Sequence, residues 1–430
     1  MKGSNPLTEK LQQGTYDGVL AKLYGQADVD TQRQRYIAAA ENFLRIFGEG
    51  DGECRLFSAP GRTEICGNHT DHNHGRVVAG SVNLDAVAVV RPLSGVIRLQ
   101  SEGYPMLTID LSRPEPVEAE KNTSAALIRG TAARFRQLGY AVDGFEAYVT
   151  SNVLKGSGLS SSAAFEVLLG VILNHLYNAA AVSAVEIARI AQYVENVYFG
   201  KPCGLMDQMA CSVGNIITID FADPEQPVIG RLEFDFSATE HALCIVDVGG
   251  NHADLTHEYA AVPHEMRAVA ASLGVEYLRE TDLPAVLAQI PTLRERHGDR
   301  AVLRAIHFMQ ENERVASMVE ALSRRDFDTF KQIILASGHS SFEYLQNVYL
   351  GNRVMEQGLS LALALAQTVL TGRGAWRVHG GGFGGTTQNF VPLDKLDEFR
   401  TLMENTFGEG SCHVLHIRPY GGVCVDTLCE

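Results

Sequence analysis

Three consecutive serines, Ser160, Ser161 and Ser162, have the residue types and the position to bind a phosphate group. They follow Gly156 and Gly158 and stand directly before an apolar pattern with helical spacing. Glycines let a ligand approach the main chain, and the free amide groups at the start of a helix favour an anion. The hydroxyl groups add hydrogen-bond donors or a magnesium ligand. The segment therefore predicts a nucleotide phosphate site, and the alternative is an ordinary helix capped by serine.

A second segment, "RTEICGNHTDHNH" from Arg62 to His74, is dense in polar side chains. It holds three histidines, two asparagines, two carboxylates and one arginine. Amide, imidazole and carboxylate groups pair donor with acceptor at fixed geometry, which suits the hydroxyl groups of a sugar. A metal site made by His69, Asp71, His72 and His74 is the rival interpretation, but no helical pair four residues apart completes it. The segment therefore favours a pocket for a polyhydroxylated ligand.

The common nucleotide-binding signatures do not account for the glycines further along the chain. The sequence contains no G-x-x-x-x-G-K-[ST] loop. "GGGFGG", Gly380 to Gly385, formally matches a dinucleotide fingerprint, but the "TTQNFVP" that follows is strand-like where that fingerprint requires a helix. We therefore exclude a dinucleotide site there.

The secondary-structure elements expected to position these segments are a mixture of strands and helices that do not strictly alternate along the chain. Helical spacing covers residues 17–47, and a short strand runs up to Pro60 before the polar segment. Helical patterns dominate from Ala163 to Phe199, and the polar run Phe221 to Gly230 is the best candidate boundary. Because strands and helices do not strictly alternate, the pattern predicts α+β lobes.

Four segments in one order resemble the galactokinases. "APGRTEICGNHTDHNHG" is similar to their sugar signature, and "GKPCGLMDQMACSVG" to the segment with their catalytic aspartate. "KGSGLSSSAAFEV" and "HGGGFGG" resemble the phosphate loop and third motif shared by the kinases of galactose, homoserine, mevalonate and phosphomevalonate, the GHMP kinases. The resemblance covers about residues 54 to 390.

This resemblance implies a two-lobed, α+β GHMP kinase architecture. The first lobe would be ribosomal-protein-S5-like and the second ferredoxin-like. We expect a helical extension over residues 1–50, the first lobe over 51–228 and the second lobe over 229–430. The implied reaction transfers a phosphoryl group from ATP, with Mg²⁺, to the anomeric hydroxyl of galactose.

The resemblance also assigns roles by position. Asp207 would face the anomeric oxygen as a base or a positioning group, and Arg62 would stabilise charge on the transferring phosphoryl group. The residues implied to contact the sugar are Asn68, His69, Asp71, Asp207 and Tyr259. Those implied to bind the ATP phosphates are Gly156, Gly158, Ser160, Ser161 and Ser162. Magnesium would be bound by Ser162 and Glu195. His379, before the glycine turn, is interpreted as structural.

Two positions depart from the galactokinase pattern. Asn68 stands where glutamate is usual in contact with the sugar's C6 hydroxyl, and His74 replaces a usual glycine. An amide lacks the negative charge of a carboxylate, so a galactose-like sugar such as galacturonate is the alternative acceptor. A non-catalytic sugar sensor is the alternative of a different class. A homoserine or mevalonate kinase is disfavoured because those kinases lack the polar segment from Arg62 to His74, which we call the sugar segment.

Composition limits the partners. With 51 acidic and 36 basic residues in 430, the formal charge is −15, which repels nucleic acid and anionic membranes. The eight cysteines form no C-x-x-C pair, and neither a secretion signal nor an apolar run long enough for a membrane span is evident. We expect a cytoplasmic monomer or weak dimer whose partners are a small sugar and ATP.

Overall fold

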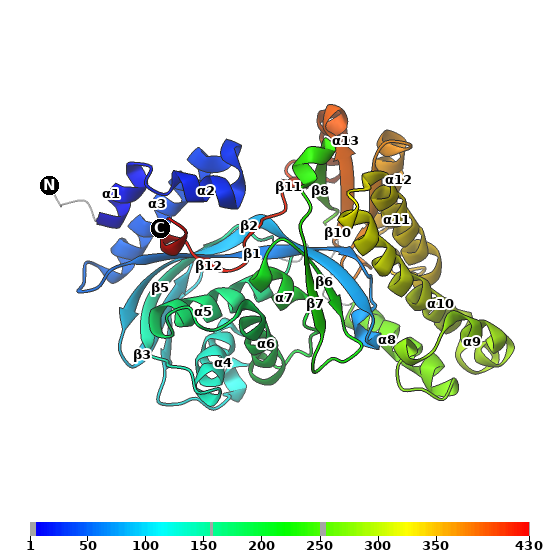
Figure 1. Ribbon diagram of the computed structural model, residues 1–430, viewed down its shortest axis with the longest axis horizontal. Coiled ribbons are helices and arrows are strands. Elements are labelled where there is room, and N and C mark those ends of the chain that lie inside the picture. Colours follow the sequence, from blue (N-terminus) through cyan, green and yellow to red (C-terminus); the bar gives the residue numbers. More distant parts are fainter. Residues whose placement is uncertain (1–5, 155–157, 250–254, 430) are drawn as a thin grey trace.

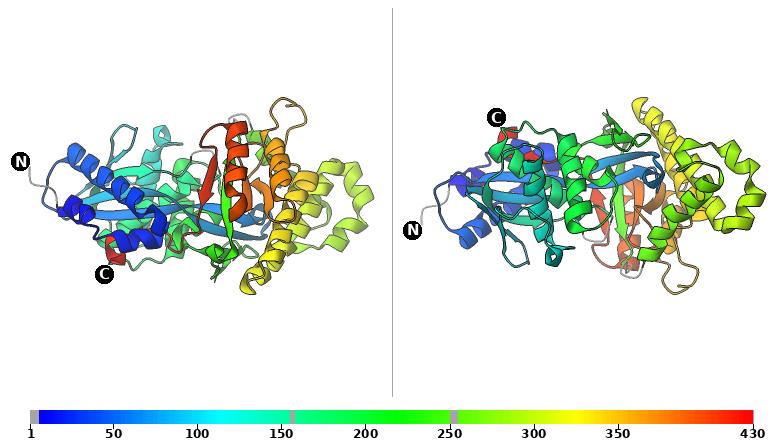
Figure 2. Two further views of the ribbon diagram at one scale, coloured as in Figure 1. Left: turned by 90° about the horizontal axis from the view of Figure 1, so that it is seen from above. Right: turned by 90° about the horizontal axis from the view of Figure 1, so that it is seen from below.

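The chain forms two lobes that lie side by side along its long axis. The structure is a computed structural model that describes residues 6–154, 158–249 and 255–429. Figure 1 and the two views of Figure 2 show each lobe built around its own β-sheet, with helices covering the sheet faces.

The first lobe is centred on the larger sheet. Within the described residues this sheet has eight strands in the order β12-β1-β2-β5-β3-β4, with β6 pairing β2 and β7 pairing β6. Its strands are β1 (Arg55–Cys66), β2 (Arg76–Leu93), β3 (Val96–Ser101), β4 (Leu107–Asp110), β5 (Gly144–Ser151), β6 (Ile216–Asp220), β7 (Val228–Leu232) and β12 (Val423–Cys424). Only the β3–β5 pair is parallel among the strand pairs described.

Helices cover both faces of this sheet. The helices α4 (Ser124–Gln137), α5 (Ser161–Tyr177), α6 (Ala184–Val194) and α7 (Met206–Val213) lie below it in Figure 1, and α1 (Pro6–Gln12), α2 (Asp17–Tyr24) and α3 (Val29–Phe47) lie above. Ala86 and Ala88 of β2 pack into the lower core, whereas Val87 and Val89 pack into the upper one. Because side chains alternate across a strand, a continuous apolar run is needed between two helical layers.

The second lobe has a ferredoxin-like topology. In the part of the chain described, four antiparallel strands stand in the order β11-β8-β10-β9. They are β8 (His241–Asp247), β9 (Ala375–His379), β10 (Thr386–Pro392) and β11 (Cys412–Leu415). The helices are α8 (Thr256–Ser272), α9 (Leu283–Ala288), α10 (Ile290–Ser323), α11 (Phe327–Ser340), α12 (Gly358–Leu370) and α13 (Leu396–Phe407). The predicted α+β, two-lobed architecture is confirmed.

The lobes do not divide at the predicted position. The boundary at residue 228 falls inside β7, which pairs with β6 of the first sheet. The chain also returns to the first lobe near its C-terminus, where β12 pairs with β1 through Phe57 and Cys424. The polar, proline-containing run Phe221 to Gly230 is largely the connection between β6 and β7, which pair as a hairpin, and it was mistaken for a boundary between lobes. The return of β12 pairs residues far apart in the sequence and leaves no local signal. Among the described residues, no helix has the length and apolarity to cross a bilayer.

The helical extension is attached to the first lobe by a buried carboxylate. Asp85 of β2 is fully buried and accepts hydrogen bonds from Tyr24 and Ser58. Two guanidinium groups also reach it, from Arg35 at 2.6 Å and Arg418 at 3.0 Å. Burial alone would raise the pKa of Asp85, but these two cations hold it below its ordinary value. Asp85 thus links α2, α3, both long strands and the C-terminal segment.

We expect Asp85→Asn to lower the free energy of unfolding by about 3–5 kcal/mol, because it leaves the fully buried guanidinium of Arg418 and the partly buried guanidinium of Arg35 without a counter-charge. Urea unfolding followed by circular dichroism measures this loss. The control is Asp394→Asn in the exposed Arg373–Asp394 pair, which should leave the free energy of unfolding nearly unchanged because solvent screens an exposed ion pair. Equal losses in the two variants would contradict a special role for Asp85.

Candidate active site

Arg62 and Asp207 meet directly between β1 and the start of α7. The Nε atom of Arg62 lies 2.8 Å from Oδ1 of Asp207, and a terminal nitrogen lies 2.7 Å from the same oxygen. The register of β1 shifts on both sides of Arg62, and such irregularities re-aim a side chain from the ladder. Although burial disfavours its charged form, Asp207 raises the pKa of Arg62 above the ordinary value. The guanidinium is therefore permanently charged and fixed on the carboxylate.

The phosphate loop joins this pair. Arg62 donates to the carbonyl of Gly158, and its main-chain nitrogen lies 3.0 Å from the carbonyl oxygen of Leu159. Ser160 caps α5 in the left-handed region, with φ 59°, and its hydroxyl donates to Oδ2 of Asp207. Ser160 was predicted to bind phosphate, whereas in this arrangement its hydroxyl is used to hold the aspartate. The helix start and the aspartate therefore belong to one hydrogen-bonded unit.

The other predicted phosphate ligands occupy the loop and the first turn of α5. Gly158 has φ 72°, in the region that favours glycine. Ser161 and Ser162 open the helix, where main-chain amides have no partner within the helix. Gly156 lies outside the described residues. The helix start thus offers the free amides and hydroxyls that an anion requires.

The glycine-rich turn Gly380–Gly385 is the meeting point of two predicted sugar ligands. The Nε2 atom of His69 lies 2.9 Å from the carbonyl oxygen of Gly381, and the hydroxyl of Tyr259 donates to Gly382 at 2.7 Å. A Cβ atom on Gly381 would lie 2.5 Å from the Tyr259 ring, so this approach requires glycine. The turn therefore brings the first-lobe sugar segment together with α8.

His69 offers one ring nitrogen to a ligand. It is buried, and among the described residues its Nδ1 atom has no hydrogen-bond partner. Burial lowers the pKa of His69 to about 4, so the ring is neutral near pH 7. Because the Gly381 carbonyl can only accept, Nε2 carries the hydrogen and Nδ1 is left as an acceptor. A sugar hydroxyl is a suitable donor for it.

Asp71 lies against the segment that precedes Asp207. A Cβ atom on Gly204 would stand 2.8 Å from Oδ2 of Asp71, so the carboxylate lies directly against this glycine. The side chain is 17% exposed, and its other oxygen accepts from the main-chain nitrogen of His72 at 3.0 Å. One carboxylate edge thus lies beside the Asp207 segment and retains access to solvent.

Asn68 differs from its predicted role as a sugar ligand. Its side chain is fully buried, and the amide nitrogen donates to Gly380 O at 2.7 Å and to Glu64 at 3.2 Å. Its oxygen accepts from Asn347 at 2.9 Å and Ser341 at 3.2 Å. With two donors and two acceptors occupied, this side chain has no capacity left for a C6 group in this arrangement. Sequence comparison with the usual glutamate did not reveal that a carboxylate, Glu64, already lies beside it.

Glu64 forms a buried ion pair across the lobes. Its Oε1 atom lies 2.7 Å from a terminal nitrogen of Arg377 on β9, and both side chains are almost completely buried. Arg377 also donates to the carbonyl of Ile65 at 2.8 Å. Burial raises the pKa of Glu64, opposed by the charge of Arg377. The pair fixes the sugar segment to the second sheet.

Three residues of α10 that sequence reasoning missed hold the sugar segment from behind. Glu311 accepts from the main-chain nitrogens of Gly67 and Asn68 at 3.0 and 3.3 Å. The Nε2 atom of His307 lies 2.9 Å from Asn68 O, and Asn312 accepts from the main-chain nitrogen of Arg76 at 2.9 Å. Burial opposes the ionisation of Glu311, but Arg314 and His307 hold its pKa well below the ordinary value. The sequence signal for these contacts was the pair His307 and Glu311 in "HFMQEN", two polar residues that lie four positions apart and therefore on one face of a helix.

The carboxylates near Ser162 can accommodate a hard cation. Glu195, directly after α6, is 3% exposed and accepts from Gln208 at 2.7 Å. Glu166, one turn after Ser162, also accepts from Gln208, and its Oε1 atom has no hydrogen-bond partner among the described residues. Burial, followed by the charge of Glu195, raises the pKa of Glu166 well above its ordinary value. An orphaned oxygen beside a second carboxylate fits Mg²⁺, which takes one or two carboxylates plus phosphates and water.

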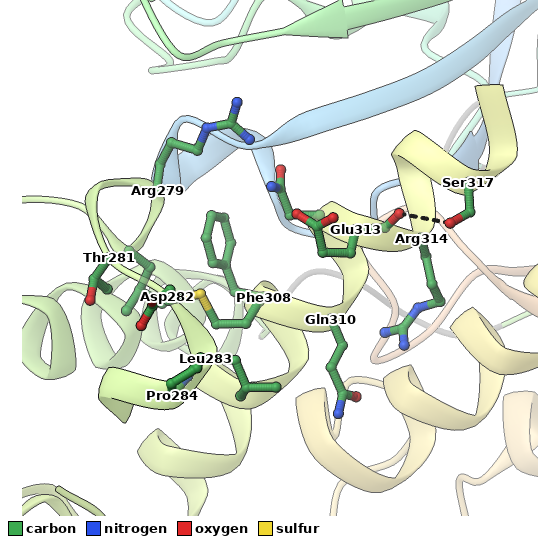
Figure 3. A pocket seen from close by; sticks show the side chains of 13 residues that line it. Arg279, Thr281, Asp282, Leu283, Pro284, Phe308, Gln310, Glu313, Arg314 and Ser317 are labelled. Carbon is green, nitrogen blue, oxygen red and sulfur yellow. Dashed lines mark hydrogen bonds between the residues drawn. The ribbon is translucent and has the colours of Figure 1, made fainter. Parts of the chain in front are cut away.

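A cavity of about 540 Å³ lies between α9 and α10, and Asn312 and Arg314 are among the residues that line it (Figure 3). Arg279 and Asp282 face Phe308 across it, and within the described chain its lining includes no predicted site residue. Phe308 touches the sugar segment from behind, since a Cβ atom on Gly75 would lie 3.0 Å from its ring. This cavity therefore backs the sugar segment.

Comparison with known proteins agrees with the fold and the motifs. Residues 126–215 match the GHMP kinases N terminal domain, and residues 41–92 match the galactokinase galactose-binding signature. The crystal structure of Lactococcus lactis galactokinase complexed with galactose superimposes with a TM-score of 0.75 at 25% identity, over 89% of this chain and 98% of that one. Methanococcus jannaschii mevalonate kinase shares the fold, with a TM-score of 0.62 at 14% identity over 86% and 99%. The fold is that of a GHMP kinase.

Curated relatives that match most of the chain identify its family within the GHMP kinases. The galactokinase of Streptomyces coelicolor is 33% identical over 374 residues, which cover 85% of this chain and 92% of that protein. The galactokinase of Clostridium tetani is 29% identical, over 86% and 91%. The chain belongs to the galactokinase family, as its four motifs predicted.

We expect Asn68→Glu to lower the free energy of unfolding by about 3 kcal/mol or more. The substitution buries a second carboxylate beside Glu64, and it removes the amide that donates a hydrogen bond to the Gly380 carbonyl. Adding Glu64→Gln should recover part of the loss. Urea unfolding measures both, with Asn352→Glu on the exposed loop as control. A stable Asn68→Glu variant with a lower KM for galactose would show that position 68 reads the sugar.

The buried imidazole of His307 should make the fold sensitive to acid. Burial lowers its pKa from 6.5 to about 4, so the unfolded chain takes up this proton first as the pH falls. Its contribution to stability is complete above pH 6.5 and is lost between 6.5 and 4, at about 1.4 kcal/mol per pH unit. Between pH 6.5 and 5, His307→Gln should therefore lose about 2 kcal/mol less than the wild type in urea unfolding. His264→Gln, at an exposed position, should leave the pH dependence unchanged.

Proposed function

We propose that this chain transfers the γ-phosphoryl group of ATP to the anomeric hydroxyl of galactose and releases galactose 1-phosphate. The observation that carries the proposal is the unit formed by Arg62, Asp207 and Ser160, in which a carboxylate and a phosphate-loop helix start share hydrogen bonds. The family supports the acceptor, because the relatives at 29–33% identity are galactokinases.

The chemistry follows from positioning and charge. With ATP phosphates at the start of α5, Asp207 lies on the side where the acceptor oxygen must approach, and it accepts or orients that hydroxyl proton. Arg62 remains charged and stabilises negative charge on the transferring group. Phosphoryl transfer needs little covalent chemistry from the protein, so these groups and the helix amides suffice.

Magnesium belongs to this proposal as the ion bound by Ser162 and Glu195, with Glu166 beside them. When bound, it neutralises charge on the ATP phosphates. A cytoplasmic location, a monomeric or weakly dimeric state, and the absence of nucleic acid and membrane partners complete the proposal.

The sugar would be held by His69, Asp71 and Tyr259, and by Asp207 at the anomeric end. Asn68 acts through the sugar segment that it fixes. Galacturonate was an alternative only because Asn68 replaced a glutamate, and the burial of Asn68 removes that reason. A sensor without activity is disfavoured because Arg62 and Asp207 retain their pairing.

We expect purified protein with ATP and Mg²⁺ to release ADP in the presence of galactose, and Asp207→Asn to lower kcat/KM by at least about 100-fold. Urea unfolding shows whether the variant retains its fold, and Asp394→Asn should keep full activity. Failure of galactose to stimulate ADP release, or full activity of Asp207→Asn, would contradict the proposal.

A further inference from the structure

A second cavity adjoins the predicted sugar site. Its volume is about 300 Å³, and besides the turn 202–205 its lining includes Asp71, His72, His74, Gln192, Arg267 and Tyr277. Asp71 and Gly204, which touch each other, also line it. Since Gly204 lies three residues before Asp207, the cavity begins where the predicted sugar contacts end. A group attached to the bound sugar on the Asp71 side would enter it.

His74 gives this cavity an aromatic wall at a backbone position that ordinarily favours glycine. The residue has φ 61° and ψ 27°, in the left-handed region, where a side chain is disfavoured. Glycine is usual here in galactokinases, yet this chain places an imidazole whose ring stacks on Tyr277 at 3.7 Å between centroids. Strained residues persist where the surroundings fix them, and they cluster at functional sites.

The cavity suits a neutral, hydroxylated group better than an anion. Arg267 brings one positive charge, but Asp71 lies in the wall and the carboxylates of Glu276 and Glu280 act on His74. A wall of aromatic side chains with a few amide and carboxylate groups is typical of pockets for hydroxylated ligands whose own rings have apolar faces. One cation stands against the carboxylates of Asp71, Glu276 and Glu280, so the surroundings carry no excess positive charge that would favour an anionic ligand.

We propose that this cavity is an accessory subsite for a neutral sugar unit attached to the galactose that is phosphorylated. The inference rests on the proposed function, since it extends the same acceptor. The reaction is unchanged: the anomeric hydroxyl of the reducing galactose gives its proton to Asp207 or to water, its oxygen forms the bond to the γ-phosphorus, and the bond between that phosphorus and the leaving oxygen of ADP breaks. The second sugar takes no chemical part. The favoured substrate is a reducing disaccharide.

The test compares galactose with four disaccharides in which a neutral hexose is attached to O2, O3, O4 or O6 of a reducing galactose. We expect kcat/KM for one isomer to exceed that for galactose by about tenfold, as extra contacts in a fitted pocket allow. The same isomer with a uronic acid in place of the hexose should be poorer. Release of ADP measures all of these rates.

Two variants remove the aromatic wall. Tyr277→Ala and His74→Gly should each lower kcat/KM for the favoured disaccharide by about tenfold and for galactose by less than about threefold. His74→Gly relieves the left-handed backbone, so loss of folding is not expected from it. Tyr104→Ala, at an aromatic residue 53% exposed elsewhere, is the matched control.

The outcomes separate the inference from the proposed function. If galactose is phosphorylated and no disaccharide is better, or if both variants affect the two acceptors equally, the subsite is overturned and the kinase activity stands. If no acceptor is phosphorylated, the proposed function fails. Calorimetry with the four disaccharides then decides the subsite, because absent binding, or binding that Tyr277→Ala does not weaken, overturns it.

Discussion

The site depends on the buried guanidinium of Arg62. It pairs with Asp207, donates to the carbonyl of Gly158 and belongs to a strand whose main chain bonds Leu159. A charge removed from water is costly unless it is paired and hydrogen-bonded. The guanidinium nitrogens of Arg62 meet this requirement by donating to Asp207 and to the phosphate loop at Gly158. The same interactions that make burial of Arg62 tolerable therefore bring the aspartate and the phosphate loop into register.

A second buried ion pair fixes the lobes relative to each other. Glu64 and Arg377 come from different sheets, and Asn68 extends the network to the glycine turn and to Asn347. Such a pair contributes little net stability compared with apolar packing, but it specifies one arrangement, because any displacement leaves a charge unpaired. The sugar segment, α10 and the glycine turn are consequently parts of a rigid junction.

The features that could be predicted from the sequence are those formed by contiguous residues. The phosphate loop, the polar segment and the glycine turn were found because their residue types and spacing are local. The α+β class followed from the grouping of strands with helices, and the two-lobed GHMP kinase architecture followed from the resemblance. The burial of Asn68 could not be predicted, since it depends on Ser341, Asn347 and Gly380, which come from distant segments. Nor could the partner of Ser160, because a serine at a helix start is equally suited to a phosphate or a carboxylate. Long-range pairing also hid the return of β12 to the first sheet.

That return has a consequence for biosynthesis. The first lobe is translated early, yet Asp85 requires Arg418, and the edge of β1 requires the strand at Val423 and Cys424. Until those residues have left the ribosomal exit tunnel, the nascent lobe carries a buried carboxylate with one of its cations missing and an open strand edge, both of which favour misassembly. Chaperone engagement during synthesis would concentrate on this interval, and a delay in translating the last helices would prolong it.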